Sequence, residues 1–135
     1  MNKPNEQPLI MVVDDSSAVR QQFILDFQTA ELSVIVFPDG ESTLEHIHVV
    51  DHGISAAVLD YRLPGMDGLS LTRQMRAHPN WSDIPILMCS TTTDPATLRK
   101  AKAIGIDAWA VNPFQPRTFI ETVHSLIAGN ADESP

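Results

Sequence analysis

Three aspartates are the residues of this 135-residue chain best suited to chemistry. Asp14 and Asp15 directly follow the apolar run at residues 9–13, and Asp60 directly follows the apolar run at residues 56–59. Carboxylates brought together repel one another and raise each other's pKa unless a cation compensates. A small cluster of oxygen ligands suits Mg²⁺, which keeps several of its own waters. The residues therefore indicate a site for a divalent metal together with an anionic group.

The elements that would position these aspartates are alternating strands and helices. Five short apolar runs are continuous rather than alternating, which is typical of strands covered on both faces. They occupy residues 9–13, 34–37, 56–59, 84–89 and 109–111. Segments with helical period lie between them and are marked by Val19, Phe23 and Phe27, by Leu44 and Ile47, by Leu71 and Met75, by residues 95–103, and by Phe119, Val123 and Ile127.

This succession predicts an α/β fold with a doubly wound, five-stranded parallel sheet, helices on both faces and right-handed crossovers. In such a sheet, ligands bind beyond the carboxyl ends of the strands, at the point where the strand order reverses. For the order 2-1-3-4-5, the first and third strands flank the reversal. Asp14, Asp15 and Asp60 would then converge on one crevice.

Length and composition predict a single domain, because 43% hydrophobic residues are enough for one core. We expect a flexible N-terminal arm at residues 1–8, one domain at residues 9–128 and a polar tail at residues 129–135. The net charge of −8 argues against direct binding of nucleic acid. The single cysteine, Cys89, excludes an internal disulfide, and no apolar run approaches ~20 residues. These features favour a cytoplasmic protein without a membrane partner.

Four motifs in order resemble the receiver domains of two-component response regulators, over about residues 9 to 128. They are "VVDDSS", "VLDYRLPGMDG", "PILMCST" and "WAVNPF". The resemblance implies a flavodoxin-like fold and a phosphoprotein that acts in signal transduction through a phosphorelay. It also implies a protein that is not an enzyme, beyond promoting its own phosphoryl transfer and dephosphorylation.

By this resemblance, Asp60 is the phosphoacceptor, which attacks the phosphorus of a phosphohistidine on a sensor histidine kinase or a phosphotransfer protein. Mg²⁺, or Mn²⁺ in its place, would be held by Asp15, Asp60 and the backbone carbonyl of Arg62. Asp14 would support the metal, mostly through water. These roles agree with phosphoryl transfer, which needs an in-line nucleophile and a cation more than further covalent chemistry.

The phosphoryl-binding and switch positions follow the family only in part. Ser90 would donate a hydrogen bond to a phosphoryl oxygen, and Thr91 follows it where the family prefers a smaller residue. Trp109 stands where the family usually has a Tyr or Phe that changes rotamer. Asn112 replaces the lysine that usually reaches the acceptor and the phosphoryl group. Arg62, two residues after the acceptor, could supply the missing cation.

Pro64, Gly65 and Gly68 follow Asp60, and we expect them to shape the turn there, where glycine can take positive φ without strain. The resemblance also places a downstream protein target on the face made by the fourth helix, the fifth strand and the fifth helix, with Trp109 at its centre. A homodimer is compatible with the same pattern.

Three alternative functions stay open at this point. A pseudo-receiver that binds partners without phosphorylation is the main one, because Asn112 removes the usual lysine. A flavodoxin-like cofactor binder shares the alternating pattern, but it would set its anion against Asp14 and Asp15. A Mg²⁺-dependent hydrolase would use the same carboxylates, although no separate general acid or base is evident near them.

Overall fold

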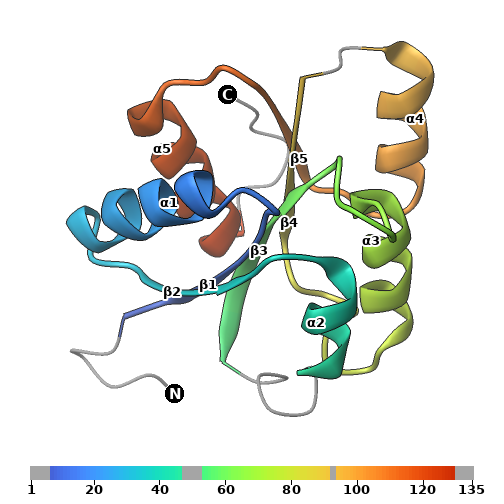
Figure 1. Cartoon of the computed structure of the whole chain (residues 1–135), viewed down its shortest axis with the longest axis horizontal. Helices are drawn as coiled ribbons and strands as arrows, with labels where there is room; N and C mark the ends of the chain where they lie inside the picture. Colours follow the sequence, from blue (N-terminus) through green and yellow to red (C-terminus); the bar gives the residue numbers. More distant parts are fainter. Residues whose placement is uncertain (1–6, 47–52, 92–93, 130–135) are drawn as a thin grey trace.

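The computed structural model describes residues 7–46, 53–91 and 94–129, in which strands and helices alternate as the sequence predicts (Figure 1). The predicted arm at residues 1–8, the predicted tail at residues 129–135 and Ile47 lie largely or wholly outside the described residues, so those parts stay predictions. The elements are β1 (Leu9–Val13), α1 (Ser17–Thr29), β2 (Ser33–Phe37), α2 (Gly40–Glu45), β3 (Ile54–Asp60), α3 (Gly68–Ala77), β4 (Ile86–Ser90), α4 (Pro95–Ala103), β5 (Ala108–Val111) and α5 (Pro116–Ile127).

The five strands form one parallel sheet in the order β2-β1-β3-β4-β5, which confirms the predicted order. The order reverses between β1 and β3, because the chain moves outward from β1 to β2 and then returns to the other side. Helices α1 and α5 cover one face of the sheet, and α2, α3 and α4 cover the other (Figure 1). None of the described helices is long and apolar enough to cross a bilayer.

Strand β1 shows why its apolar run is continuous. Ile10 and Val12 pack with the cluster under α1 and α5, whereas Met11 and Val13 pack with the cluster on the opposite face. All four side chains are fully buried. Burial of such a side chain contributes about 1.5–3 kcal/mol, so both faces of the strand select apolar residues. The last residue of this buried strand lies directly before Asp14.

Two expectations about the elements are wrong in detail. Strand β4 begins at Ile86 and not at Ile84, because Pro85 has no N–H to donate to a ladder. Val19 was expected on the buried face of the first helix, but its side chain is 40% exposed. Phe23 and Phe27 carry the packing of α1 instead. Val19 lies at the carboxyl edge of the sheet, where the helix extends past the core.

The opposite edge of the sheet is held by Arg76, which closes a clamp between α3 and the starts of β4 and β5. Its Nη1 donates to the carbonyls of Trp81 (3.2 Å) and Ser82 (3.1 Å), and its Nη2 donates to the carbonyl of Gly105 (2.8 Å). The same Nη2 pairs with Asp107 Oδ2 at 3.2 Å. Asp107 Oδ2 also accepts from the backbone N–H at the start of β4 (2.8 Å). The amino ends of these strands are therefore tied together.

Candidate functional site

Asp14, Asp15 and Asp60 meet at the carboxyl edge of the sheet, as the strand order predicts. Each offers a carboxylate oxygen, and the three oxygens lie within 4.8 Å of one another. The register of β1 and β3 pairs Val13 with Leu59, so the next residues along each strand are neighbours. Asp14 is buried, Asp60 is half-buried and Asp15 is exposed. This arrangement can hold a hard divalent cation that still contacts solvent.

Asp14 is fixed by hydrogen bonds to three other parts of the chain. Its Oδ1 accepts from the backbone N–H of Ser16 (2.9 Å), and its own N–H donates to the carbonyl of Phe37 (3.1 Å). Its carbonyl accepts from Arg20 Nη1 (2.7 Å). The side chain of Ser16, and not an aspartate, caps α1 by accepting from the N–H of Val19 (3.2 Å). The aspartates are therefore left for a role other than helix capping.

Arg20 is a site residue that the sequence analysis missed. Arg20 binds the carbonyl of Asp14, and its charge partly opposes the rise that burial causes in the pKa of the Asp14 carboxyl group. The available signal was a basic residue on the first turns of the helix that follows an acidic pair. Arg20 stabilises the end of β1 while leaving the crevice open.

The electrostatics of the cluster favour the binding of a proton or a cation, because three neighbouring negative charges repel one another. Burial, together with the charges of Asp14 and Asp15, raises the pKa of Asp60 to about 6, although a hydrogen bond from Arg62 acts in the opposite direction. That bond runs from the backbone N–H of Arg62 to Asp60 Oδ1 (3.2 Å). Burial likewise raises the pKa of Asp14. A divalent ion would relieve the same repulsion without a proton.

The metal-free protein should therefore lose stability as pH rises from about 4 to about 6. The folded pKa of Asp60 lies above its ordinary value, so in this range the unfolded chain binds fewer protons and the free energy of unfolding falls. Solvent screens this half-buried group, so we expect a loss of about 1–2 kcal/mol. Asp14 contributes with the same sign. Asp39 and Asp94, whose pKa values are lowered, act oppositely only below about pH 4.

Urea unfolding in a chelator across this pH range measures the effect. The same series with Mg²⁺ should show a stability gain above about pH 6 that fades at lower pH, because the metal and the proton compete for the carboxylates. A chelated protein whose stability instead rises between about pH 4 and about pH 6 would contradict the electrostatics described for the cluster.

The three aspartates open into a hollow of about 270 Å³. Asn112 lines this hollow, so the residue that departs from the family pattern does lie at the site. Its backbone N–H donates to the carbonyl of Ser90 (2.8 Å), which joins the ends of β5 and β4. No lysine or arginine is among the residues lining it in the described part of the chain, which are Asp14, Asp15, Ser16, Val19, Phe23, Asp60, Cys89, Asn112 and Phe114.

Cys89 contributes to the wall of the hollow from β4, where it pairs in register with Asp60. Burial raises the pKa of its thiol well above the ordinary value, and the charges of Asp60 and Asp14 add to the effect. The buried thiol is therefore uncharged at neutral pH and unreactive.

Ser90 and Thr91 lie at and just beyond the end of β4. Ser90 is buried, one residue past the register partner of Asp60, and Thr91 is exposed. Neither is among the residues that line the hollow, so their contact with a phosphoryl group stays a prediction. Trp109 lies on β5, and its ring centroid is 6.1 Å from that of Tyr61, the residue after Asp60. The structure thus connects Trp109 to the acceptor through Tyr61.

The two glycines of the turn after β3 are needed for different reasons. Gly65 has a φ of +71°, as expected. Gly68 is not among the glycines with positive φ, so glycine is needed there for another reason. A Cβ at Gly68 would lie 2.5 Å from the carbonyl oxygen of Asp60 and 2.7 Å from Met88 Sδ. The start of α3 therefore approaches the backbone of the acceptor too closely for any side chain.

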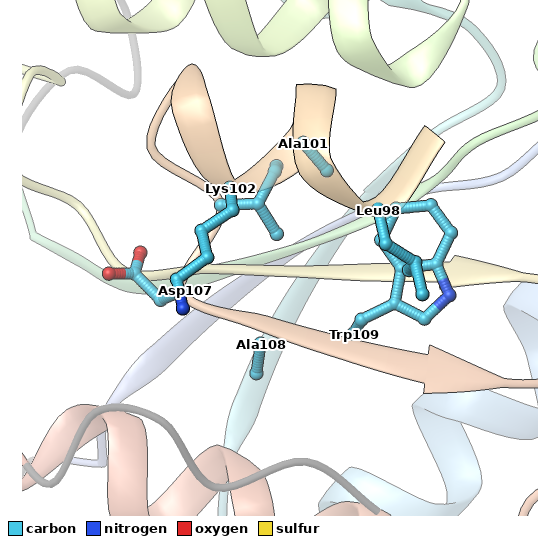
Figure 2. A pocket seen from close by; sticks show the side chains of 7 residues that line it. Leu98, Ala101, Lys102, Asp107, Ala108 and Trp109 are labelled. Atoms are coloured by element: carbon cyan, nitrogen blue, oxygen red, sulfur yellow. The ribbon is translucent and has the colours of Figure 1, made fainter. Parts of the chain in front are cut away.

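A second hollow, of about 290 Å³, lies between α4 and β5. Leu98 and Trp109 lie beside each other at one end, and Lys102 extends from α4 toward Asp107 at the other (Figure 2). Ala101 and Ala108 form apolar walls between them. This hollow lies on the face where the sequence analysis expects a downstream partner.

Comparison with known proteins agrees with this geometry. The curated relatives include the cyclic di-GMP phosphodiesterase response regulator RpfG of Xanthomonas campestris pv. campestris, 32% identical over 80% of this chain and 29% of its own. They also include the DNA-binding response regulator MtrA of Mycolicibacterium smegmatis, 27% identical over 92% of this chain and 52% of its own. The chain thus spans between about a third and about half of the length of these relatives.

Solved structures show the same fold. The chemotaxis response regulator CheY4 of Vibrio cholerae matches with a TM-score of 0.82 at 28% identity, over 90% of this chain and 99% of its own. The receiver domain of the sensor histidine kinase PA1611 of Pseudomonas aeruginosa, solved with a magnesium ion in its active-site cleft, matches with a TM-score of 0.78 at 20% identity, over 91% of this chain and 99% of its own. The family model of the response regulator receiver domain matches residues 10–124. The chain belongs to the family of response regulator receiver domains.

Proposed function

We propose that this receiver domain takes a phosphoryl group from a histidine kinase or a phosphotransfer protein onto Asp60, and that the modification switches the binding of a protein partner. The observation that carries the proposal is the meeting of three carboxylates from two strands within 4.8 Å. Such a cluster is unfavourable unless a cation shares it. Family membership adds the reaction that this site would serve.

Asp60 is the proposed nucleophile, because its carboxylate is the half-buried member of the cluster at the end of β3. With a pKa of about 6, it is mostly ionised at neutral pH. A carboxylate oxygen would form a bond to phosphorus while the bond from phosphorus to the donor's imidazole nitrogen breaks, and the imidazole recovers a proton. The N–H of Arg62 on Oδ1 orients the carboxylate for this displacement.

The proposed metal ligands are Asp15, Asp60 and the backbone carbonyl of Arg62, with Asp14 supporting the ion mostly through water. Mg²⁺, or Mn²⁺ in its place, would offset the negative charge on the phosphoryl oxygens. Ser90 is proposed to donate to one phosphoryl oxygen after transfer, with Thr91 beside it. The exposed side chain of Arg62 is the proposed substitute for the missing lysine, because its charge partly opposes the rise that burial causes in the pKa of Asp60.

We propose a phosphoacceptor and not an enzyme with free substrates, acting within one domain at residues 9–128. Among the described residues, no histidine lines the hollow to serve as a general acid or base for turnover. The buried thiol of Cys89 suits a reducing compartment and supports a cytoplasmic location.

The direct test is incubation with acetyl phosphate and Mg²⁺, followed by intact mass measurement. One phosphoryl group per chain, without multiple turnovers of small phosphoesters, is the expected result. Failure to accept any phosphoryl group from acetyl phosphate or from a phosphorylated kinase would favour the pseudo-receiver. That alternative is suggested by Asn112, which stands in place of the usual lysine.

We also propose that a protein partner reads the modification on the face formed by α4, β5 and α5. The hollow between α4 and β5 supports this, because Trp109 forms its wall and contacts Tyr61 beside the acceptor. A net charge of −8 argues against nucleic acid as the direct partner.

NMR shifts caused by such a partner should cluster at Leu98, Lys102 and Trp109. The same titration with the unphosphorylated protein is the control and should give weaker shifts at the same positions. Shifts centred on α2 instead would show that the partner does not bind the face formed by α4, β5 and α5.

A further inference from the structure

We propose that the connection between β2 and α2 braces both acid-bearing segments of the site, and that Glu41 is the positioning residue of this brace. The inference rests on the proposed metal role of Asp15, Asp60 and the carbonyl of Arg62. Glu41 belongs to none of the proposed ligand or phosphoryl-binding positions. The brace would set how well the turn after β3 presents its carbonyl to the ion.

The first contact of the brace is with the end of β1. Phe37 is the last residue of β2, and its carbonyl accepts from the N–H of Asp14 (3.1 Å). The segment that carries the acidic pair is therefore hydrogen-bonded to the residue from which the chain leaves for α2.

The start of α2 is fixed by Asp39. Its Oδ1 accepts from the N–H of Ser42 (2.7 Å) and also contacts the hydroxyl of Ser42. Its carbonyl accepts from the hydroxyl of Thr43 (2.8 Å), a fully buried side chain. An N-cap of this kind orders the first helical turn. Gly40 and Glu41 lie within that ordered turn, only a few residues after Phe37.

The second contact of the brace is with the turn after β3. Glu41 Oε2 accepts from the N–H of Met66 (3.2 Å), across 25 residues of sequence. A Cβ built on Gly65 would lie 2.7 Å from the same oxygen, so the carboxylate occupies the space that a side chain at position 65 would need. Gly40 approaches the same turn, because its Cβ position is 3.1 Å from Met66 Sδ. The beginning of α2 is thus seated against residues 65–66.

The turn itself is closed around Arg62. A hydrogen bond from the N–H of Gly68 to the carbonyl of Tyr61 (2.9 Å) joins the two ends of the turn. Within the turn, the N–H of Arg62 donates to Asp60 Oδ1 (3.2 Å). In a loop closed in this way, displacement of Met66 also displaces Arg62. Glu41 therefore acts on the proposed metal ligand through the backbone of the turn, and not by contact with the ion.

Calorimetric titration of Mg²⁺ into the metal-free full chain tests the inference. Glu41→Ala removes one hydrogen-bond acceptor, and we expect it to weaken Mg²⁺ binding by roughly threefold to tenfold. Glu41→Gln keeps an acceptor oxygen and should bind within about twofold of the unchanged protein. Glu45→Ala removes the same charge from an exposed position at the end of α2 and should also have little effect.

Gly65→Asn provides a second variant that does not alter Glu41. Asparagine tolerates positive φ better than most residues, but its side chain would occupy the space of the Glu41 carboxylate. It should weaken Mg²⁺ binding about as much as Glu41→Ala, and the double variant should be no weaker than either single variant, because both changes break one interaction. Thermal unfolding of each variant reports whether the fold is intact.

Hydrogen exchange in the metal-free chain gives a readout that does not depend on the ion. The amide of Met66 should exchange faster in Glu41→Ala than in Glu41→Gln. If Glu41→Ala and Glu41→Gln weaken Mg²⁺ binding equally, the effect comes from the charge of Glu41, and the proposed bracing role is wrong. Mg²⁺ binding that Glu41→Ala leaves unchanged would overturn this inference alone. Absence of Mg²⁺ binding by the unchanged protein would overturn the proposed function together with it.

Discussion

Asp60→Asn should reduce labelling by acetyl phosphate by at least roughly 1,000-fold while the fold stays intact. The amide has the shape of the carboxylate, and its oxygen can still accept from the N–H of Arg62, which donates to Asp60 at 3.2 Å. The amide is not a nucleophile toward phosphorus, so the transfer itself is lost. The variant also removes one of three clustered charges, so its stability in a chelator at neutral pH should be no lower than that of the unchanged protein.

Intact mass after incubation with acetyl phosphate and Mg²⁺ measures the loss. Asp83→Asn is the matched control, because Asp83 is exposed and lies near Arg76 at the opposite edge of the sheet. The control should be labelled like the unchanged protein. Undiminished labelling of Asp60→Asn would show that another carboxylate is the acceptor.

Asn112→Lys should weaken Mg²⁺ binding by roughly tenfold. Asn112 lines the hollow that contains the three aspartates, and the described lining has no lysine or arginine. A unit charge about 4 Å from a carboxylate is worth a few kcal/mol at an effective dielectric of ~20, before desolvation reduces it. An ammonium at this position would therefore compete with the divalent ion. It should also strengthen the response of Trp109 emission to phosphorylation, because it favours the phosphoryl group more than the bare site.

Asn112→Met is the control, because it lengthens the side chain without adding a charge. Arg62 provides the competing explanation, since its charge already acts on Asp60 and partly opposes the rise that burial causes in the pKa of that carboxyl group. If its guanidinium replaces the lysine, Asn112→Lys will change little and Arg62→Ala will impair the phosphorylated state. Calorimetry and Trp109 emission on both single variants and the double variant separate these cases. Tighter Mg²⁺ binding by Asn112→Lys would refute the electrostatic argument.

The sheet and the acidic cluster could be predicted from the sequence because both depend on strand order and burial. The fully buried β1 shows itself as an uninterrupted apolar run, and the aspartates that follow β1 and β3 stand at the reversal of strand order. Asn112 could be placed for the same reason, since it directly follows a strand on the same edge. In each case the local sequence already contains the information that decides the position.

The contacts that refine the site could not be predicted in this way. Arg20 binds a carbonyl of Asp14 six residues earlier, and Glu41 binds Met66 across 25 residues. Both depend on how separate segments approach one another, for which periodicity and turn chemistry carry no signal. Gly68 is the clearest case, because glycine there is required by a neighbouring carbonyl and not by its own φ.

The clamp formed by Arg76 anchors the edge of the sheet that lies opposite to the acidic cluster. Arg76 and Asp107 tie the starts of β4 and β5 to α3, while the unbalanced carboxylates lie beyond the opposite ends of neighbouring strands. A strand that pivots about an anchored end moves most at its far end. Movement of β4 or β5 about their anchored starts would therefore be greatest at Ser90 and Asn112, whose backbones are joined by a hydrogen bond.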